Sequence, residues 1–146
     1  MQNEKLFNGT ILYLKIITIF SMVMCFVLMF FQSFDPMGSL EMMIVQDLYK
    51  TDVMPADARP MFVFVFLLFD MLSVLSMAAQ YLVIVHGLQK KQKWAFHYMI
   101  LIGVCWPIGA GIIAWYCKTP AYYVSVGMML CLFLPPLLVL RKHCKA

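Results

Sequence analysis

The chain has 146 residues, of which 64% are hydrophobic and only 12% are charged, and its mean hydropathy is +0.86. A soluble globular domain averages roughly 45–50% apolar and about 25% charged residues, so this composition excludes that class and indicates an integral membrane protein. The formal net charge of +4 comes mainly from short basic segments beside the apolar ones, and we infer no nucleic-acid site from it.

Four apolar segments are long enough to cross a hydrocarbon core, which takes roughly 20 helical residues. The first contains no small-residue cleavage site, so we expect it to remain as a membrane anchor rather than a signal peptide. The intervening segments are too short to fold separately, which predicts a single membrane domain over residues 1–146. The expected fold is all-α, an antiparallel bundle of four transmembrane helices. The predicted spans are residues 11–32, 61–86, 94–116 and 120–140.

The segment between the first two spans, residues 33–60, is acidic and contains turn signals at Asp35-Pro36. Ser39–Tyr49 is predicted to form a short helix at the membrane interface. Pro60 is expected in the first turn of the next helix, where its missing N–H costs little.

Basic residues predict the orientation. Three lysines, at 90, 91 and 93, lie between the second and third spans, and Arg141, Lys142 and Lys145 follow the fourth. By the positive-inside rule, both termini face the cytoplasm and the acidic segment faces the opposite side. The membrane would be the plasma or inner membrane in a bacterium and an endomembrane in a eukaryote.

The second span, "FVFVFLLFDMLSVLSMAAQYLVIV", carries Asp70 near its middle. An aspartate at the bilayer centre costs at least about 2.5–3.5 kcal/mol, and such residues are functional by default. We expect the polar arc around Asp70 to face the bundle interior, because the opposite side is rich in Phe, Leu and Val. Four side chains fall with Asp70 inside an arc of roughly 100°: Ser73, Met77, Gln80 and Tyr81.

Two interpretations of this arc stay open. Asp70 either ties two helices together through hydrogen bonds, or it anchors a ligand amine or hydroxyl, or moves a proton. Trp106 and Pro107 are expected to shape the facing wall. Pro107 and the pair Pro135-Pro136 are expected to kink their helices and to free backbone carbonyls.

The metal-ligating and thiol residues predict no cofactor. His86, His97 and His143 fall on the same predicted side of the membrane, yet none of their spacings is diagnostic of a metal or haem site. The five cysteines include no CxxC pair, so we do not expect a thiol relay.

Several local features together resemble a known family. The first span ends near Asp35, the second carries the acid of "FLLFD", the following basic turn ends in "KW", and the fourth span ends in "RK". This layout resembles the EXPERA superfamily, which includes the emopamil-binding protein and the sigma-2 receptor. The resemblance implies that Asp70 and Asp35 match its two acids and that a cavity binds sterol-like or cationic amphiphilic molecules.

Some members of that superfamily isomerise a sterol double bond. The further acid and the histidine that the isomerases use have no counterpart here, so a lipid or sterol isomerase activity is not the expected function. The "KWA" hairpin and the chain length are also similar to small bacterial four-span proteins of the DoxX-like kind.

The leading functional hypothesis is binding of a lipophilic or amphipathic small molecule in an intramembrane cavity anchored by Asp70. One alternative is a small proton-coupled transporter, working as a homodimer, in which Asp70 cycles its proton. Another is a non-catalytic subunit or assembly factor of a larger membrane complex. The expected partners are membrane lipids and the lipophilic ligand. Besides Asp70, the residues expected to bind it are Ser73, Met77, Gln80, Tyr81, Trp106 and Asp35.

Overall fold

The computed structural model describes residues 2–34, 46–50, 56–120 and 122–144. Regular structure in these ranges is helical throughout, which confirms the expected all-α class. Within them, four segments are long and apolar enough to cross a membrane, one for each expected span. These segments are Asn3–Val27, Arg59–Lys90, Lys93–Cys117 and Tyr122–Leu140.

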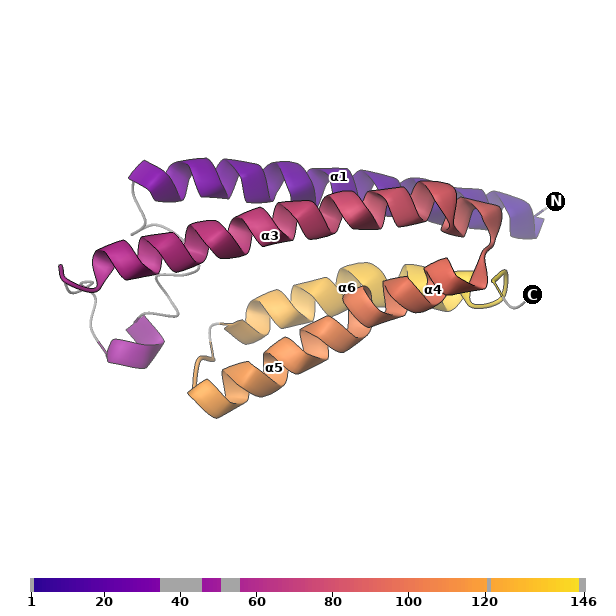
Figure 1. Ribbon diagram of the computed structural model, residues 1–146. Coiled ribbons are helices and arrows are strands. Elements are labelled where there is room, and N and C mark those ends of the chain that lie inside the picture. The colour runs from indigo at the N-terminus through magenta and orange to yellow at the C-terminus, as the bar shows by residue number, and fades with distance from the viewer. Residues whose placement is uncertain (1, 35–45, 51–55, 121, 145–146) are drawn as a thin grey trace.

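The first half of the chain forms two long helices that lie side by side (Figure 1). Helix α1 covers Gln2–Phe34 and therefore starts well before the first expected span, while α3 covers Arg59–His86. Pro60 lies in the first turn of α3, as expected, where no intrahelical partner is available for an N–H. The two helices form the most extensive interhelical contact of the described chain.

A tight turn joins α3 to the next helix. Gly87 ends α3, a single 3₁₀ turn covers Leu88–Lys90, and the N–H of Gln92 donates to the Gly87 carbonyl at 3.0 Å. The Nζ of Lys15 on α1 donates to Oε1 of Gln89 in this turn at 2.9 Å. The ammonium group near the start of the first span is therefore held by the turn between the second and third.

The third span is divided by an irregular turn. It consists of α4 at Lys93–Ile100, a π-helical turn η3 at Leu101–Cys105, and α5 at Trp106–Cys117. Pro107 has no N–H to donate to the carbonyl four residues earlier, and the backbone changes its hydrogen-bond pattern just before it, so that the N–H of Trp106 donates to the Leu101 carbonyl. This wider turn is the local form taken by the break expected at Pro107.

The third span crosses α6 (Tyr122–Leu140) at Gly103. A Cβ atom at Gly103 would lie 3.0 Å from Cβ of Phe133 and 3.5 Å from Cδ1 of Leu137. A small residue at this position therefore lets the two backbones approach closely, as small residues do between membrane helices.

Thr119 follows the end of α5 and bonds back to that helix. Its N–H and its hydroxyl both donate to the Ala114 carbonyl, at 2.9 and 3.3 Å. The last carbonyls of a helix lack intrahelical partners, and Lys118 adopts a left-handed conformation with φ of 56° that turns the chain back toward them.

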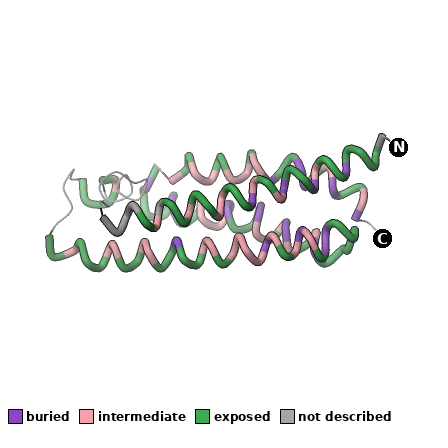
Figure 2. Tube along the Cα trace, turned by 90° about the horizontal axis from the view of Figure 1, so that it is seen from above, coloured by how far each residue is buried: buried purple, intermediate pink, exposed green. Residues whose placement is uncertain are grey.

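The hydrophobic core lies toward the end of the bundle that carries both termini, which we call the terminal end (Figures 1 and 2). There the ring of Phe7 lies 5.2 Å from the ring of His143 and 5.1 Å from Nζ of Lys91, joining α1 to the last turn and to the α3–α4 connection. Elsewhere most large apolar side chains are exposed, as expected for a lipid-facing surface. The core consists of Phe7, Ile11, Leu14, Ile84, Leu88, Ala95, Met99, Phe133, Leu137, Leu140 and Cys144.

The predicted interfacial helix Ser39–Tyr49 lies mostly outside the described residues. Residues 46–49 are helical, and the ring of Tyr49 packs edge-on against Phe62 of α3 at 5.7 Å between centroids.

Replacing Gly87 by alanine tests the tight turn. A Cβ there would overlap Cβ of Ala95 and lie 2.9 Å from the Val83 carbonyl oxygen, so backbone must move. We expect G87A to lower the free energy of unfolding in detergent by about 1–3 kcal/mol. G109A is the matched control, because a Cβ at Gly109 meets no heavy atom within 4 Å. Equal thermal unfolding of the two variants would contradict the packing described here.

Candidate functional site

The buried face of α3 carries the polar arc. Asp70, Gln80 and Ile84 are its buried residues, with Asp70 only 5% and Gln80 only 1% exposed. All three fall within the same arc at 100° per residue, and α1 is the helix that covers α3 most extensively. Ser73, Met77 and Tyr81 of the same arc are half-buried.

Ser73 and Gln80 of this arc differ in the hydrogen bonds that their side chains form. The Ser73 hydroxyl donates to the Phe69 carbonyl at 2.9 Å, so it is satisfied inside its own helix. Gln80, in contrast, is fully buried, and its Oε1 forms no hydrogen bond with any described residue. Buried polar atoms are normally paired with protein or water. The Gln80 Oε1 is therefore an available hydrogen-bond acceptor on the buried face of α3.

Thr18 of α1 is a polar residue that the sequence interpretation missed. It is completely buried, and its Oγ1 forms no hydrogen bond within the described chain. Thr18 continues the buried stripe of Phe7, Ile11 and Leu14 at helical spacing. That spacing is the signal that would have placed it inside the bundle.

Trp106 and Pro107, which are expected to shape the wall facing Asp70, lie on α5. Trp106 is 55% exposed, and its helix α5 packs on α6 and η3 rather than extensively on α3. Pro107 beside it is buried. Asp35 lies outside the described residues.

The histidines do not converge. His86 and His97 are exposed, whereas His143 packs half-buried against Phe7. Within the described part of the chain, no three His, Cys, Asp or Glu side chains come together in a metal-binding arrangement. Burial raises the pKa of the Cys144 thiol, with the charge of Lys91 opposing, which disfavours the nucleophilic thiolate.

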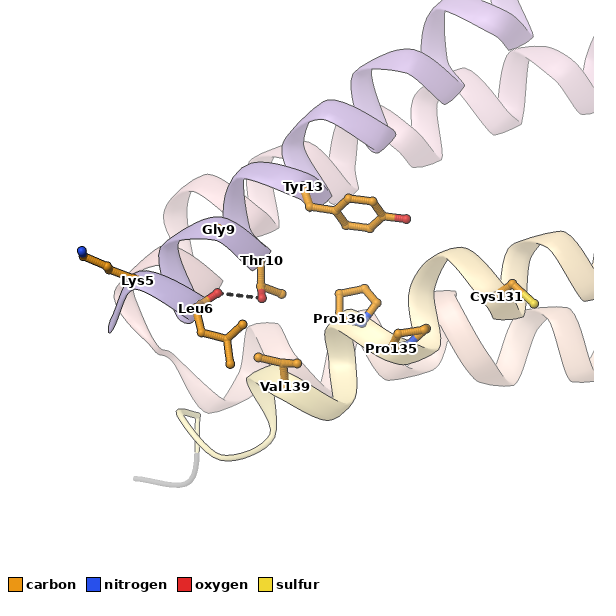
Figure 3. A pocket seen from close by; sticks show the side chains of 9 residues that line it. All are labelled: Lys5, Leu6, Gly9, Thr10, Tyr13, Cys131, Pro135, Pro136 and Val139. Carbon is orange, nitrogen blue, oxygen red and sulfur yellow. Dashed lines mark hydrogen bonds between the residues drawn. The ribbon is translucent and has the colours of Figure 1, made fainter. Parts of the chain in front are cut away.

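A hollow lies instead between α1 and α6, near the terminal end, and we call it the α1–α6 groove (Figure 3). Its volume is about 400 Å³, and Asp70 does not line it. The ring of Tyr13 extends from α1 toward Cys131, Pro135 and Pro136 of α6. The groove is lined by Lys5, Leu6, Gly9, Thr10, Tyr13, Cys131, Pro135, Pro136 and Val139.

The two prolines explain the polar groups of this groove. Neither has an N–H, so the carbonyls four residues earlier, those of Cys131 and Leu132, receive no α-helical hydrogen bond from them. The Tyr13 hydroxyl donates to the Leu132 carbonyl at 3.4 Å. This hydrogen bond joins α1 to α6 at the carbonyl to which Pro136 cannot donate. The Cys131 carbonyl, left in the same way by Pro135, belongs to a residue that lines the groove.

Gly9 leaves room on the α1 side of the groove. A Cβ placed there meets no heavy atom within 4 Å, so the glycine faces open space. Beside it, the Thr10 hydroxyl donates to the Leu6 carbonyl at 2.8 Å and keeps its lone pairs as acceptors.

Comparisons of this chain with protein-family models, with curated proteins and with solved structures find no match. The resemblance to the EXPERA superfamily therefore stays a prediction.

Exchange of Tyr13 for phenylalanine tests the α1–α6 contact. Interhelical hydrogen bonds in membranes average about 0.6 kcal/mol, so we expect Y13F to lower stability by about that amount. In a P136A background, the new N–H of residue 136 reaches the Leu132 carbonyl, and the same change should then cost almost nothing. Thermal unfolding of the four proteins measures this coupling. Purely additive effects would show that the hydroxyl does not serve the carbonyl left by Pro136.

Proposed function

We propose that this protein is an integral membrane protein that binds a lipophilic or amphipathic small molecule in the α1–α6 groove. The observation that carries the proposal is the groove itself, with a volume of about 400 Å³ between two helices that are apolar enough to span a membrane. Small-molecule sites are mostly apolar hollows of about 300–1,000 Å³ with a few placed polar groups. A ligand would enter sideways from the bilayer.

The lining of the groove supports an amphipathic ligand over a purely apolar one. Leu6, Val139 and the proline rings supply apolar wall, while the Cys131 carbonyl offers an acceptor that Pro135 cannot serve. A backbone carbonyl in hydrocarbon gains most from a donor, because no bulk water competes. A ligand hydroxyl or amide N–H at the Cys131 end of the groove would supply that donor.

This proposal places the ligand away from Asp70. Asp70 belongs to the buried face of α3, whereas the groove lies between α1 and α6. We assign Asp70, together with Gln80, to the α1–α3 interface, for which we propose a different function, proton-coupled transport.

The proposed arrangement in the membrane is an antiparallel bundle with both termini cytoplasmic. The α3–α4 connection and the first residue of α4, which together carry three lysines, lie at the same end as both termini (Figure 1). Positive residues gathered at one end favour the cytoplasmic side for that end. The predicted interfacial helix would then lie at the opposite surface, where its apolar side chains face lipid.

A bulky residue at Gly9 tests the groove. In G9L the side chain occupies the open space on the α1 wall, so we expect severalfold weaker photolabelling of α1 and α6 by a diazirine-bearing monoacylglycerol, a neutral amphiphile. The labelled peptides are identified by mass spectrometry. G127L is the matched control, because Gly127 also faces open space but does not line the groove. Equal labelling of G9L and the wild type would count against the proposed site.

Proton-coupled transport is a second candidate, favoured by the polar groups of the α1–α3 interface. Asp70 is buried there, and the buried Thr18 and Gln80 each have an oxygen that pairs with no described residue. Such spare capacity suits bound water, and a carboxyl beside water can exchange protons.

Uptake of a cation into proteoliposomes tests the proton-coupled transport. An outward proton gradient, with the vesicle interior acidic, should drive uptake of ethidium, a lipophilic cation, into vesicles that contain the wild type. D70N should abolish this uptake because the amide cannot ionise. D57N is the control, since Asp57 is exposed outside the helices. Full uptake by D70N would remove Asp70 from any proton-coupled step.

A further inference from the structure

A second hollow, of about 870 Å³, lies next to the α1–α6 groove at the terminal end. The two hollows are adjacent because they share two apolar lining residues, Leu6 and Val139. We call the second hollow the head hollow. Its lining is more polar than that of the groove, and it consists of Asn3, Glu4, Leu6, Leu138, Val139, Arg141, Lys142 and His143.

The charges around this junction are unbalanced. Lys5 lines the groove, Arg141 and Lys142 line the head hollow, and Glu4 is the one carboxylate among the residues that line either. Three cations against one carboxylate leave an excess of two positive charges. In Figure 3, Lys5 lies at the end of the groove away from Tyr13 and Cys131, with its ammonium group pointing outward.

We propose that the groove and the head hollow together bind one anionic membrane lipid, with the phosphate group at Arg141 and Lys142 of the head hollow and an acyl chain along the α1–α6 groove. This inference rests on the proposed function and names its ligand class. A lipid is favoured over a soluble phosphate compound because Arg141 and Lys142 line the same hollow as Leu6 and Val139, which also belong to the apolar wall of the groove.

Native mass spectrometry of the full chain in neutral detergent tests this assignment. The probes are dioctanoyl phosphatidylglycerol and dioctanoyl phosphatidylcholine, which have the same acyl chains and differ in net headgroup charge. We expect the anionic lipid to bind the wild type about tenfold more tightly, because cationic side chains near the headgroup attract its negative charge. R141Q/K142Q should lose this preference, and G9L should weaken the binding of both lipids.

Matched cations supply the control. K90Q/K93Q removes two exposed lysines at the same end of the bundle, one from the α3–α4 connection and one from the start of α4, and neither lines the groove or the head hollow. This variant should keep the full preference. Equal loss in both double variants would show a diffuse charge effect and would overturn the assignment of the headgroup site.

The remaining outcomes separate the two proposals. Equal affinity of the wild type for both lipids, still weakened by G9L, overturns the anionic assignment and leaves the groove proposal standing. Affinity that G9L does not change overturns both. Displacement of phosphatidylglycerol by millimolar inorganic phosphate would assign the site to a soluble anion and overturn the lipid. Unfolding temperatures of all variants, measured in the same detergent, exclude loss of fold as the cause.

Discussion

Hydrocarbon cannot form hydrogen bonds, and the arrangement of the helices follows from how the chain meets that constraint at its prolines. Pro107, Pro135 and Pro136 each remove a backbone donor inside a membrane-spanning segment. The third span responds with a π turn, and the fourth receives a donor from another helix through the Tyr13 hydroxyl. The second solution brings α1 to α6 and, with the open face at Gly9, leaves the groove between them.

Burial is concentrated at the terminal end because small residues let the helices approach closely there. Near the terminal end, small residues allow close contact: Gly87 meets Ala95, and Gly103 meets Phe133. Leu14, Met99 and Leu140 are fully buried in the space that these contacts enclose. Farther from this end, α1 and α3 stay together and α5 stays with α6, while the interface of the first pair holds the buried carboxyl of Asp70.

Much of the fold follows from local sequence, whereas the groove does not. Apolar length predicts the four helices, and helical periodicity places Asp70 and Gln80 on the buried face of α3. The prolines indicate breaks but not which hydrogen-bond pattern relieves them, so the π turn is not predictable from Pro107 alone. The groove depends on a contact between Tyr13 and Leu132, which are 119 residues apart, and a single sequence carries no signal for that pairing.

The position of the core has a mechanical consequence. Because the residues that join the α1–α3 pair to the α4–α6 pair gather at the terminal end, a rotation of one pair against the other about this end would move the far ends of the helices most. The thickness and lateral pressure of the surrounding bilayer would therefore have their greatest effect at those far ends, since the core of the described chain lies at the other end.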